Sequence, residues 1–427
     1  MSVLGIVVEY NPFHKGHTYH LQESKKVANP ELTVAVMSGN FVQRGEPAII
    51  DKFARTEMAL NAGVDLVVQL PLIYSIQDAG GFARGSVSLL DHLGVTDIVF
   101  GSESGNLDLL DEVASILVNE PEEYLAFLKK YLGEGFSFPN ARKYAIRDYL
   151  TGKNNDRAIS IEEIGSSNNI LGLEYIHSIK ELKSKMKPHL IKRIGANYHD
   201  EKHNETYSSA TSIRKSIIAK DWEKVKSDVP DYSYKIILRE LEKGKGPVSI
   251  ESMESFLLPF LKTFDRDRMK EYYGFVEGLD ARFEECASNS ATINEFFSCV
   301  KAKRFTYTRI KRLLLNLVFN IDDELIKESN SKGPQYIRIL GFNERGRNYL
   351  SEIKKNLIIP QLTTPSRWAK VLKTANKNEK TVVESELFYR HFMLDIKETE
   401  IHSCFYSDKS LVRETSELKS RPIYMRS

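Results

Sequence analysis

The chain has few cysteines, little net charge and no long hydrophobic run. Its 427 residues include only three cysteines, Cys286, Cys299 and Cys404, and its formal net charge is +2. An odd number of widely spaced cysteines argues against a disulfide framework and favours a cytoplasmic location. No apolar stretch approaches the roughly 20 residues that span a bilayer, and no basic segment precedes the first strand as in a signal peptide. These absences predict a cytoplasmic protein that has no membrane partner.

The length and the hydrophobic pattern predict two domains. Hydrophobic residues make up 41% of the chain, which is enough for real cores, and the chain is too long for one ordinary core. In residues 1–220, short apolar runs alternate with helical patterns, and this alternation predicts a Rossmann-like α/β domain with a parallel sheet. The expected strands are residues 3–8, 32–38, 65–71, 97–100 and 190–194.

Strand signals fade after residue 220, and helical periodicity replaces them. The clearest example places Ile310, Leu313, Leu314, Leu317 and Val318 on one face of a helix. We therefore expect residues 221–427 to form a second, mainly helical domain.

The most informative segment is the turn that joins the first strand to the first helix, Asn-Pro-Phe-His-Lys-Gly-His at residues 11–17. The backbone N–H groups and the positive dipole end of a helix that starts there favour an anion. His14 and His17 are three residues apart, so on a helix they share one face. Imidazoles at this place can donate hydrogen bonds to charge that builds up on a phosphate.

The repeat of His14, His17 and His20 also raises the question of a metal. Zinc sites on helices more often include cysteine or acidic partners, and no cysteine lies near this segment. We therefore predict no metal site in the protein.

The run from Gly5 to His17 resembles the bacterial tRNA(Met) cytidine acetate ligases, and its His-x-Gly-His end resembles the signature of the wider nucleotidyltransferase superfamily. Members of this superfamily direct a nucleophile onto the α-phosphate of ATP. The resemblance implies that His14 and His17 are catalytic. The ATP contacts that it implies are Val7, Val8, Glu9, Tyr10, Asn11, Pro12, Phe13, His14, Lys15, Gly16, His17, Thr18, Tyr19, His20, Gly101, Asn168, Arg193, Ser209 and Arg214.

Four of these implied contacts, Gly101, Asn168, Ser209 and Arg214, come from three later segments, and the first two of these segments also have simpler explanations. Gly101 follows the fourth expected strand, where a glycine lets a backbone approach a ligand, but it also suits an ordinary turn. Asn168 lies in a Ser-Asn stretch that favours helix N-caps. The segment from Tyr207 to Arg214 resembles the Ser-Ser-Thr-x-x-Arg element that grips the β- and γ-phosphates from a helix N-terminus, although Ala210 interrupts it.

Two basic residues follow the second expected strand, at the sheet edge that faces the nucleotide in such folds. Arg44 lies in a loop between two glycines, and Lys52 opens the next helix. We expect them to contact either phosphate or acetate. The alternative is an ordinary solvated helix face.

Basic and aromatic residues alternate in the second half of the chain. Residues 301–320 contain no acidic side chain, and Phe305 and Tyr307 lie among the cations. Cations for phosphates and aromatics for unstacked bases suit RNA binding, although a solvated face over a helical core explains the same pattern. The expected tRNA-binding residues are Lys303, Arg304, Arg309, Lys311, Arg312, Arg338 and Arg345.

The resemblance implies an ATP-dependent ligase that joins acetate to the wobble cytidine of elongator tRNA(Met) and forms N(4)-acetylcytidine. Acetate and ATP would first give acetyl-adenylate, and Mg²⁺ is expected to accompany ATP without assignable protein ligands. One alternative is an adenylyltransferase that acts on a small phosphorylated metabolite. Another is a non-catalytic RNA-binding protein that ATP regulates. The sequence marks neither the acetate pocket nor the group that accepts the proton of the cytidine amine.

Overall fold

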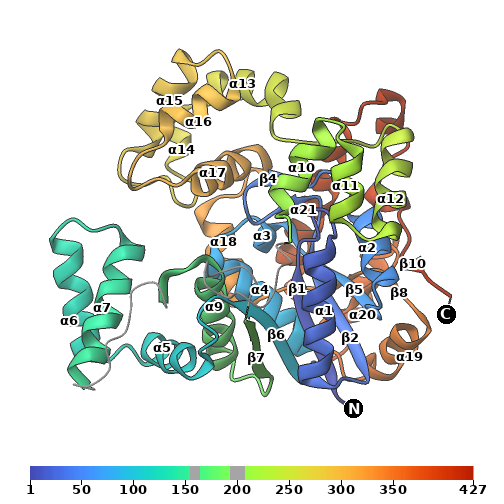
Figure 1. The fold of residues 1–427 in the computed structure, drawn as a ribbon, viewed down its shortest axis with the longest axis horizontal. Coiled ribbons are helices and arrows are strands. Elements are labelled where there is room, and N and C mark those ends of the chain that lie inside the picture. The colour runs from blue at the N-terminus through green and yellow to red at the C-terminus, as the bar shows by residue number, and fades with distance from the viewer. Residues whose placement is uncertain (154–163, 193–206, 427) are drawn as a thin grey trace.

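A computed structural model describes residues 1–153, 164–192 and 207–426 of the chain. Its centre is an eight-stranded sheet that helices cover on both faces (Figure 1). The strands of this sheet are β1 (Val3–Val8), β2 (Leu32–Ser38), β5 (Leu66–Leu70), β6 (Asp97–Ser102), β7 (Lys187–Lys192), β8 (Ile337–Phe342), β9 (Gln361–Leu362) and β10 (Ile423–Tyr424), and a separate hairpin consists of β3 (Phe41–Val42) and β4 (Glu46–Pro47).

The α-helices occupy both halves of the chain, and the second half is mainly helical, as the sequence predicts. In the first half they are α1 (Lys15–Ala28), α2 (Lys52–Asn61), α3 (Leu72–Ser75), α4 (Ala79–His92), α5 (Leu107–Asn119), α6 (Glu122–Gly133), α7 (Phe138–Lys153), α9 (Ser167–Glu181) and α10 (Ala210–Ile218). In the second half they are α11 (Trp222–Asp228), α12 (Asp231–Glu242), α13 (Glu254–Thr263), α14 (Arg266–Met269), α15 (Leu279–Asn289), α16 (Ile293–Val300), α17 (Tyr307–Phe319), α18 (Asp323–Lys332), α19 (Glu344–Ile353), α20 (Trp368–Ala375) and α21 (Ser385–Ser403).

Five parallel strands form the middle of the sheet, in the order β5-β2-β1-β6-β7. These are the five strands that the sequence predicts, with small shifts of their ends. Alternate residues of β2 point to opposite faces: Val34 and Val36 pack with α4, whereas Ala35 and Met37 pack with α1 and α2. Because both faces are buried, the strands read as continuous apolar runs rather than as alternating ones.

The second half of the chain completes this sheet, which the sequence did not predict. Strand β8 pairs antiparallel with β5, with Leu66 opposite Phe342, and β9 and β10 pair parallel with β8. The sheet therefore takes strands from both sides of the domain boundary expected near residue 220, and that boundary stays a prediction.

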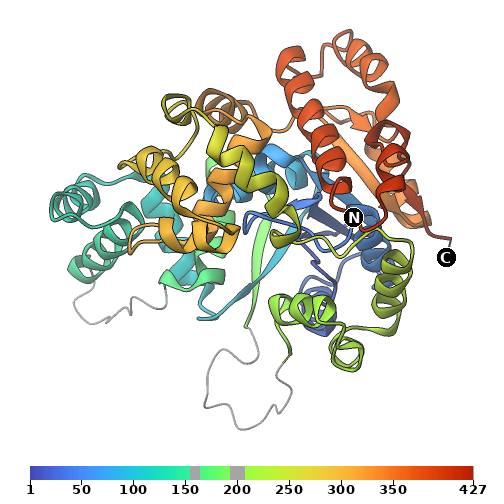
Figure 2. The ribbon, with the colours of Figure 1, turned by 90° about the horizontal axis from the view of Figure 1, so that it is seen from above.

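Two helical parts project from the body around the sheet. Helices α6 and α7 form a hairpin on one side, and α13 to α16 pack together above it (Figures 1 and 2). A disulfide joins Cys286 of α15 to Cys299 of α16, so one disulfide exists although the cysteine pattern argued against a disulfide framework. Within the described residues, no helix is long and apolar enough to cross a membrane.

Candidate active site

The two expected catalytic histidines lie together at the start of α1. The helix begins at Lys15, three residues before the predicted start, and His14 is its N-cap residue. The Nδ1 atom of His14 accepts a hydrogen bond from the Gly16 amide at 3.1 Å, and Nδ1 of His17 accepts one from the His14 amide at 3.3 Å. Imidazole nitrogens thus accept hydrogen bonds from the backbone N–H groups at this helix end, where Ser, Thr or Asp side chains usually do so.

This capping arrangement fixes the protons of both rings. The imidazoles of His14 and His17 stack with their centroids 3.8 Å apart and their planes inclined at 31°. Because Nδ1 is an acceptor in each ring, a neutral ring carries its proton on Nε2. The helix N-terminus thus presents two imidazole N–H donors that are fixed before any ligand arrives.

Both histidines line a cavity with a volume of about 590 Å³. Volumes of this order hold small-molecule ligands. The cavity lies at the carboxyl ends of β1 and β6, where ligands bind in open α/β sheets. Among the expected site residues, those that line it are Val7, Val8, Glu9, Tyr10, His14, Gly16, His17, Tyr19, His20, Arg44, Gly101, Asn168, Ser209 and Arg214.

The beginning of α10 closes one side of this cavity. Ser209 is the N-cap residue and accepts a hydrogen bond from the Ser212 amide at 3.2 Å. The Arg214 guanidinium donates to the backbone oxygen of Asn11 at 3.0 Å and pairs with the Glu46 carboxylate at 3.2 Å. A second helix N-terminus and a fixed guanidinium therefore lie beside the histidine turn at this cavity, and both favour phosphate.

The opposite side is formed by the end of β6 and the start of α9. Glu103 accepts hydrogen bonds from the Asn168 and Asn169 amides at 3.3 and 3.1 Å and from the Ser166 hydroxyl at 2.9 Å. Burial alone would raise the pKa of Glu103, but the hydrogen bonds from Asn168 and Ser166 hold it below its usual value. The carboxylate caps α9 and fixes Asn168 beside Gly101 in the cavity wall.

Comparisons with known proteins show which family the chain resembles. The family model for HIGH Nucleotidyl Transferase matches residues 1–417. The tRNA(Met) cytidine acetate ligase of Kosmotoga olearia is 55% identical over 426 residues and 100% of both chains, and that of Thermotoga maritima is 46% identical over 98% of this chain and 99% of its own. The crystal structure of Thermotoga maritima TmcAL bound with alpha-thio ATP aligns with a TM-score of 0.93 and 45% identity over 100% of both chains.

The chain belongs to the tRNA(Met) cytidine acetate ligase family. The resemblance that the Gly5 to His17 run suggested is therefore confirmed, and it extends over the full length. The family also confirms an α/β fold with a mostly parallel sheet followed by a helical C-terminal region.

Several expected ATP contacts of this ligase-family chain build the turn rather than line the cavity. Asn11 is 2% exposed and accepts a hydrogen bond from the Ile49 amide at 2.9 Å, and Phe13 is fully buried against Tyr10. Pro12, Lys15 and Thr18 do not line the cavity either. Arg193 lies outside the described residues.

The two basic residues that follow β2 have different environments. Arg44 is exposed and lines the cavity, so it is placed to meet an anion. Lys52 does not line the cavity, and its side chain is fully buried. Its ammonium lies 2.8 Å from both the Glu417 carboxylate and the Gln69 side-chain oxygen, so a contact with phosphate or acetate in this cavity does not fit Lys52.

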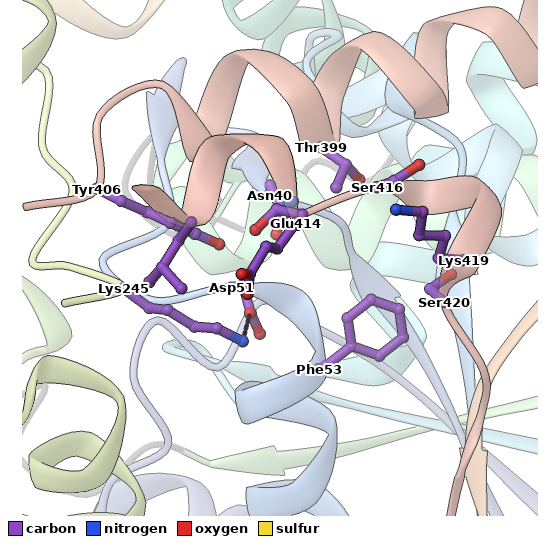
Figure 3. Close-up of a pocket in the computed structure, with 12 residues that line it drawn as sticks. Asn40, Asp51, Phe53, Lys245, Thr399, Tyr406, Glu414, Ser416, Lys419 and Ser420 are labelled. Atoms are coloured by element: carbon purple, nitrogen blue, oxygen red, sulfur yellow. Dashed lines mark ion pairs between the residues drawn. The ribbon is translucent and has the colours of Figure 1, made fainter. Parts of the chain in front are cut away.

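A smaller cavity of about 290 Å³ lies between α2, α21 and the C-terminal segment (Figure 3). Asp51, the N-cap residue of α2, pairs with Lys245 in its wall at 3.6 Å. None of the residues that the sequence marked as catalytic or ATP-binding lines it. The sequence-based site prediction therefore does not concern this smaller cavity.

The expected tRNA-binding residues do not form one surface. Lys303 and Arg304 are exposed in the loop before α17. Arg309 lies over the Phe305 ring at 5.3 Å. By contrast, Lys311 pairs with Glu46, and Arg312 donates to the backbone oxygen of Gln43 at 3.3 Å.

Two residues of this set lie away from the others. Arg338 is 1% exposed and pairs with Glu417 at 2.8 Å, so it cannot reach a polynucleotide. Arg345 is exposed, but it pairs with Asp65 at 2.9 Å at the amino end of β5. That end is opposite to the cavity, because the cavity lies where the parallel strands finish.

A Mg²⁺ site built by the protein would need a cluster of carboxylate or imidazole ligands. Among the described residues, no three His, Cys, Asp or Glu side chains gather as metal ligands. A cage of protein ligands therefore does not fit, and a Mg²⁺ ion that accompanies ATP would rely on phosphate oxygens and water, as this ion commonly does.

Proposed function

We propose that the protein ligates acetate to the wobble cytidine of elongator tRNA(Met) and forms N(4)-acetylcytidine at the expense of ATP. In the first step, an acetate oxygen attacks the α-phosphate of ATP, and acetyl-adenylate and pyrophosphate form. In the second step, the exocyclic amine of cytidine takes the acetyl group and AMP leaves. The observation that carries this proposal is the pair of stacked imidazoles, His14 and His17, whose Nε2 protons are fixed in a cavity large enough for a nucleotide.

Different residues of the cavity would bind different parts of ATP. The two histidines stabilise the charge that develops on the α-phosphate in the transition state. Ser209 and Arg214, at the start of α10, hold the β- and γ-phosphates that leave as pyrophosphate. Gly101 and Asn168 lie on the side of the cavity where the nucleoside would rest. The related Thermotoga maritima structure, bound with alpha-thio ATP, supports this cavity as the ATP site.

Arg44 is the residue that we assign to the acetate carboxylate. Its side chain lies in the β3–β4 turn on the cavity wall, and Arg214 on the same wall is already held by Glu46. A guanidinium can bind a carboxylate through two parallel hydrogen bonds. Such a contact would place the acetate beside the α-phosphate without any further charged group.

The tRNA would approach over the exposed loop before α17. Lys303 and Arg304 supply cations there, and Tyr307 is 46% exposed and available to stack on a base. The following turn of α17 contacts the β3–β4 hairpin through Lys311 and Arg312, so this surface adjoins the cavity. A cytoplasmic location, where tRNA is modified, suits this function.

One assay tests the proposal. The protein is incubated with ATP, labelled acetate and unmodified tRNA, and label is followed into RNA. Incorporation that requires both ATP and tRNA is expected. Pyrophosphate release with a small phosphate ester but not with acetate would instead support a metabolite adenylyltransferase, and ATP binding without turnover would support a regulated RNA-binding protein.

A further inference from the structure

Glu9 places a carboxylate in a cavity that otherwise suits anions. It follows the last residue of β1 and lines the cavity together with His14, His17 and Arg214. Triphosphate and acetate are both negatively charged, so a carboxylate beside them opposes their binding. Adenylate formation also moves no proton that would need a base. The first step therefore gives the Glu9 carboxylate no proton to accept.

Hydrogen bonds hold both the carboxylate and the backbone of Glu9. Its Oε1 atom accepts a hydrogen bond from the Gln43 amide at 2.8 Å. Its backbone oxygen accepts one from the buried guanidinium of Arg55 at 2.6 Å. Within the described part of the chain, Oε2 accepts no hydrogen bond. One oxygen thus anchors the carboxylate, and the second remains for a ligand in the cavity.

We propose that Glu9 is the catalytic base of the acetyl-transfer step, an inference that rests on the proposed function. The lone pair of cytidine N4 attacks the carbonyl carbon of acetyl-adenylate, and a C–N bond forms. A proton of N4 passes to Oε2 of Glu9. The C–O bond to the phosphate breaks with its electron pair, and AMP leaves as an anion. Glu9 then returns the proton to water.

The electrostatic surroundings favour this role. Burial raises the pKa of Glu9, and the Gln43 amide and the guanidinium groups of Arg44, Arg214 and Arg55 oppose this increase only in part. The other titratable side chains that face it are the imidazoles of α1 and the Tyr175 hydroxyl of α9. A carboxylate with a raised pKa is a better proton acceptor near neutral pH than an exposed one.

The test separates the two half-reactions in the full-length protein with the Glu9→Gln variant. Glutamine keeps the acceptor for the Gln43 amide and removes the base. We expect acetate-dependent exchange between ATP and pyrophosphate to fall far less than transfer, because Glu9 lines the ATP cavity but accepts no proton in the first step. Single-turnover transfer from acetyl-adenylate to tRNA should fall about 100-fold or more. In the wild type the transfer rate should rise with pH and reach a plateau, and Glu9→Gln should lose this rise.

Two further variants make the result specific. Glu57→Gln removes a carboxylate of α2 that lies outside the cavity and pairs with Arg239 of α12, and both half-reactions should be unchanged. Glu9→Asp keeps a carboxylate, and its transfer rate should retain the rise with pH. Thermal unfolding of each variant shows whether it is folded.

Three results would overturn the proposal. An equal loss of exchange and transfer in folded Glu9→Gln would make Glu9 an ATP contact. A changed Mg²⁺ requirement for exchange would make it a metal ligand, and wild-type transfer rates would leave it without a role. Failure of the proposed function looks different, because the wild type itself would then show no acetate-dependent exchange.

Discussion

The ammonium of Lys52 lies 2.8 Å from the carboxylate of Glu417, and these side chains are 0% and 1% exposed. Lys52 opens α2 in the first half of the chain, whereas Glu417 lies in a short 3₁₀ helix near the C-terminus. Arg338 of β8 pairs with the same carboxylate at 2.8 Å. One buried acid therefore ties the last segment of the chain to helix α2 and to strand β8.

Removing one partner of this pair should destabilise the whole fold. Glu417→Gln leaves two buried cations without their counter-ion, and breaking a buried pair in this way costs about 3–5 kcal/mol. Urea unfolding should show this loss in the free energy of unfolding. As a control, Glu23→Gln removes an i,i+3 partner of Lys26, whose side chain is 72% exposed, and should change the free energy of unfolding by less than about 1 kcal/mol. Equal effects of the two substitutions would contradict the assignment.

The pH dependence of stability should reveal a second acid of this cluster, Glu398 of α21. Burial raises its pKa from 4.5 to about 8, against the attraction of Lys52. The folded state therefore binds a proton that the unfolded state releases, so this group makes stability fall as pH rises from 4.5 to about 8. Glu398→Gln should remove that fall. Unfolding at pH values of about 5 and about 9 should show a variant that gains relative to the wild type at the higher pH.

The contribution of Glu417 to stability changes with pH in the opposite direction to that of Glu398. Burial alone would raise its pKa, but Lys52 and Arg338 lower it to about 2. Its contribution is present above the unfolded-state pKa of 4.5 and is lost as pH falls towards about 2. The acid limb of the stability curve should therefore become shallower in Glu417→Gln, with the remainder due to other acids with lowered pKa values such as Glu103, whereas the limb above pH 5, which comes from Glu398, should remain.

The same cluster explains which part of the fold the sequence could not reveal. Strands β1, β2 and β5 are mostly apolar, so their residue types alone predict buried parallel strands. Strand β8 has Arg338 as its second residue, and a cation there looks like a surface or RNA-binding residue. Only the pairing with Glu417, 79 residues further along the chain, makes this arginine a core residue. Such a pairing leaves no local pattern.

For the site too, the sequence reveals what lies within one short segment and misses what depends on pairing between distant segments. His14 and His17 lie in one short turn, and their chemistry follows from the strand-turn-helix context. Lys52 also comes after a strand end at this edge of the sheet, but it is buried because it pairs with Glu417. No local sequence rule predicts that pairing. No sequence pattern marks Glu46, although it pairs with both Arg214 and Lys311. A lone acid in a short hairpin carries no signal before the fold brings two cations to it.

The role of the histidine pair predicts a selective loss of the first half-reaction. His17→Ala removes one Nε2 donor and also the acceptor for the His14 amide. Losing one such donor costs about 100-fold or more in rate, so acetyl-adenylate formation should be almost abolished. tRNA binding should be intact, because the loop before α17 is unchanged. Normal adenylate formation, measured by exchange between ATP and pyrophosphate, would refute the role of His17.

The Arg214–Glu46 ion pair leads to a prediction about how strongly Arg214 binds the phosphates of ATP. Arg214→Ala should raise the KM for ATP and lower the rate of adenylate formation, because a guanidinium at the leaving phosphates is lost. Glu46→Gln keeps a hydrogen-bond acceptor but removes the charge that competes with phosphate for Arg214. Its ATP affinity should therefore equal or exceed that of the wild type. Weaker ATP binding in Glu46→Gln would show that the carboxylate positions Arg214 instead of competing for it.

The exposed loop before α17 should dominate the electrostatic part of tRNA binding. Lys303 and Arg304 are exposed and have no ion-pair partner among the described residues, so replacing both with alanine removes two cations that can neutralise phosphates. Affinity should fall, and the slope of log K against log salt should become shallower by roughly 1–2 units. Arg345→Ala, at the opposite end of the sheet, should leave both quantities unchanged. Filter binding over a series of salt concentrations measures them, and an equal effect of Arg345→Ala would move the tRNA surface to the far side of the molecule.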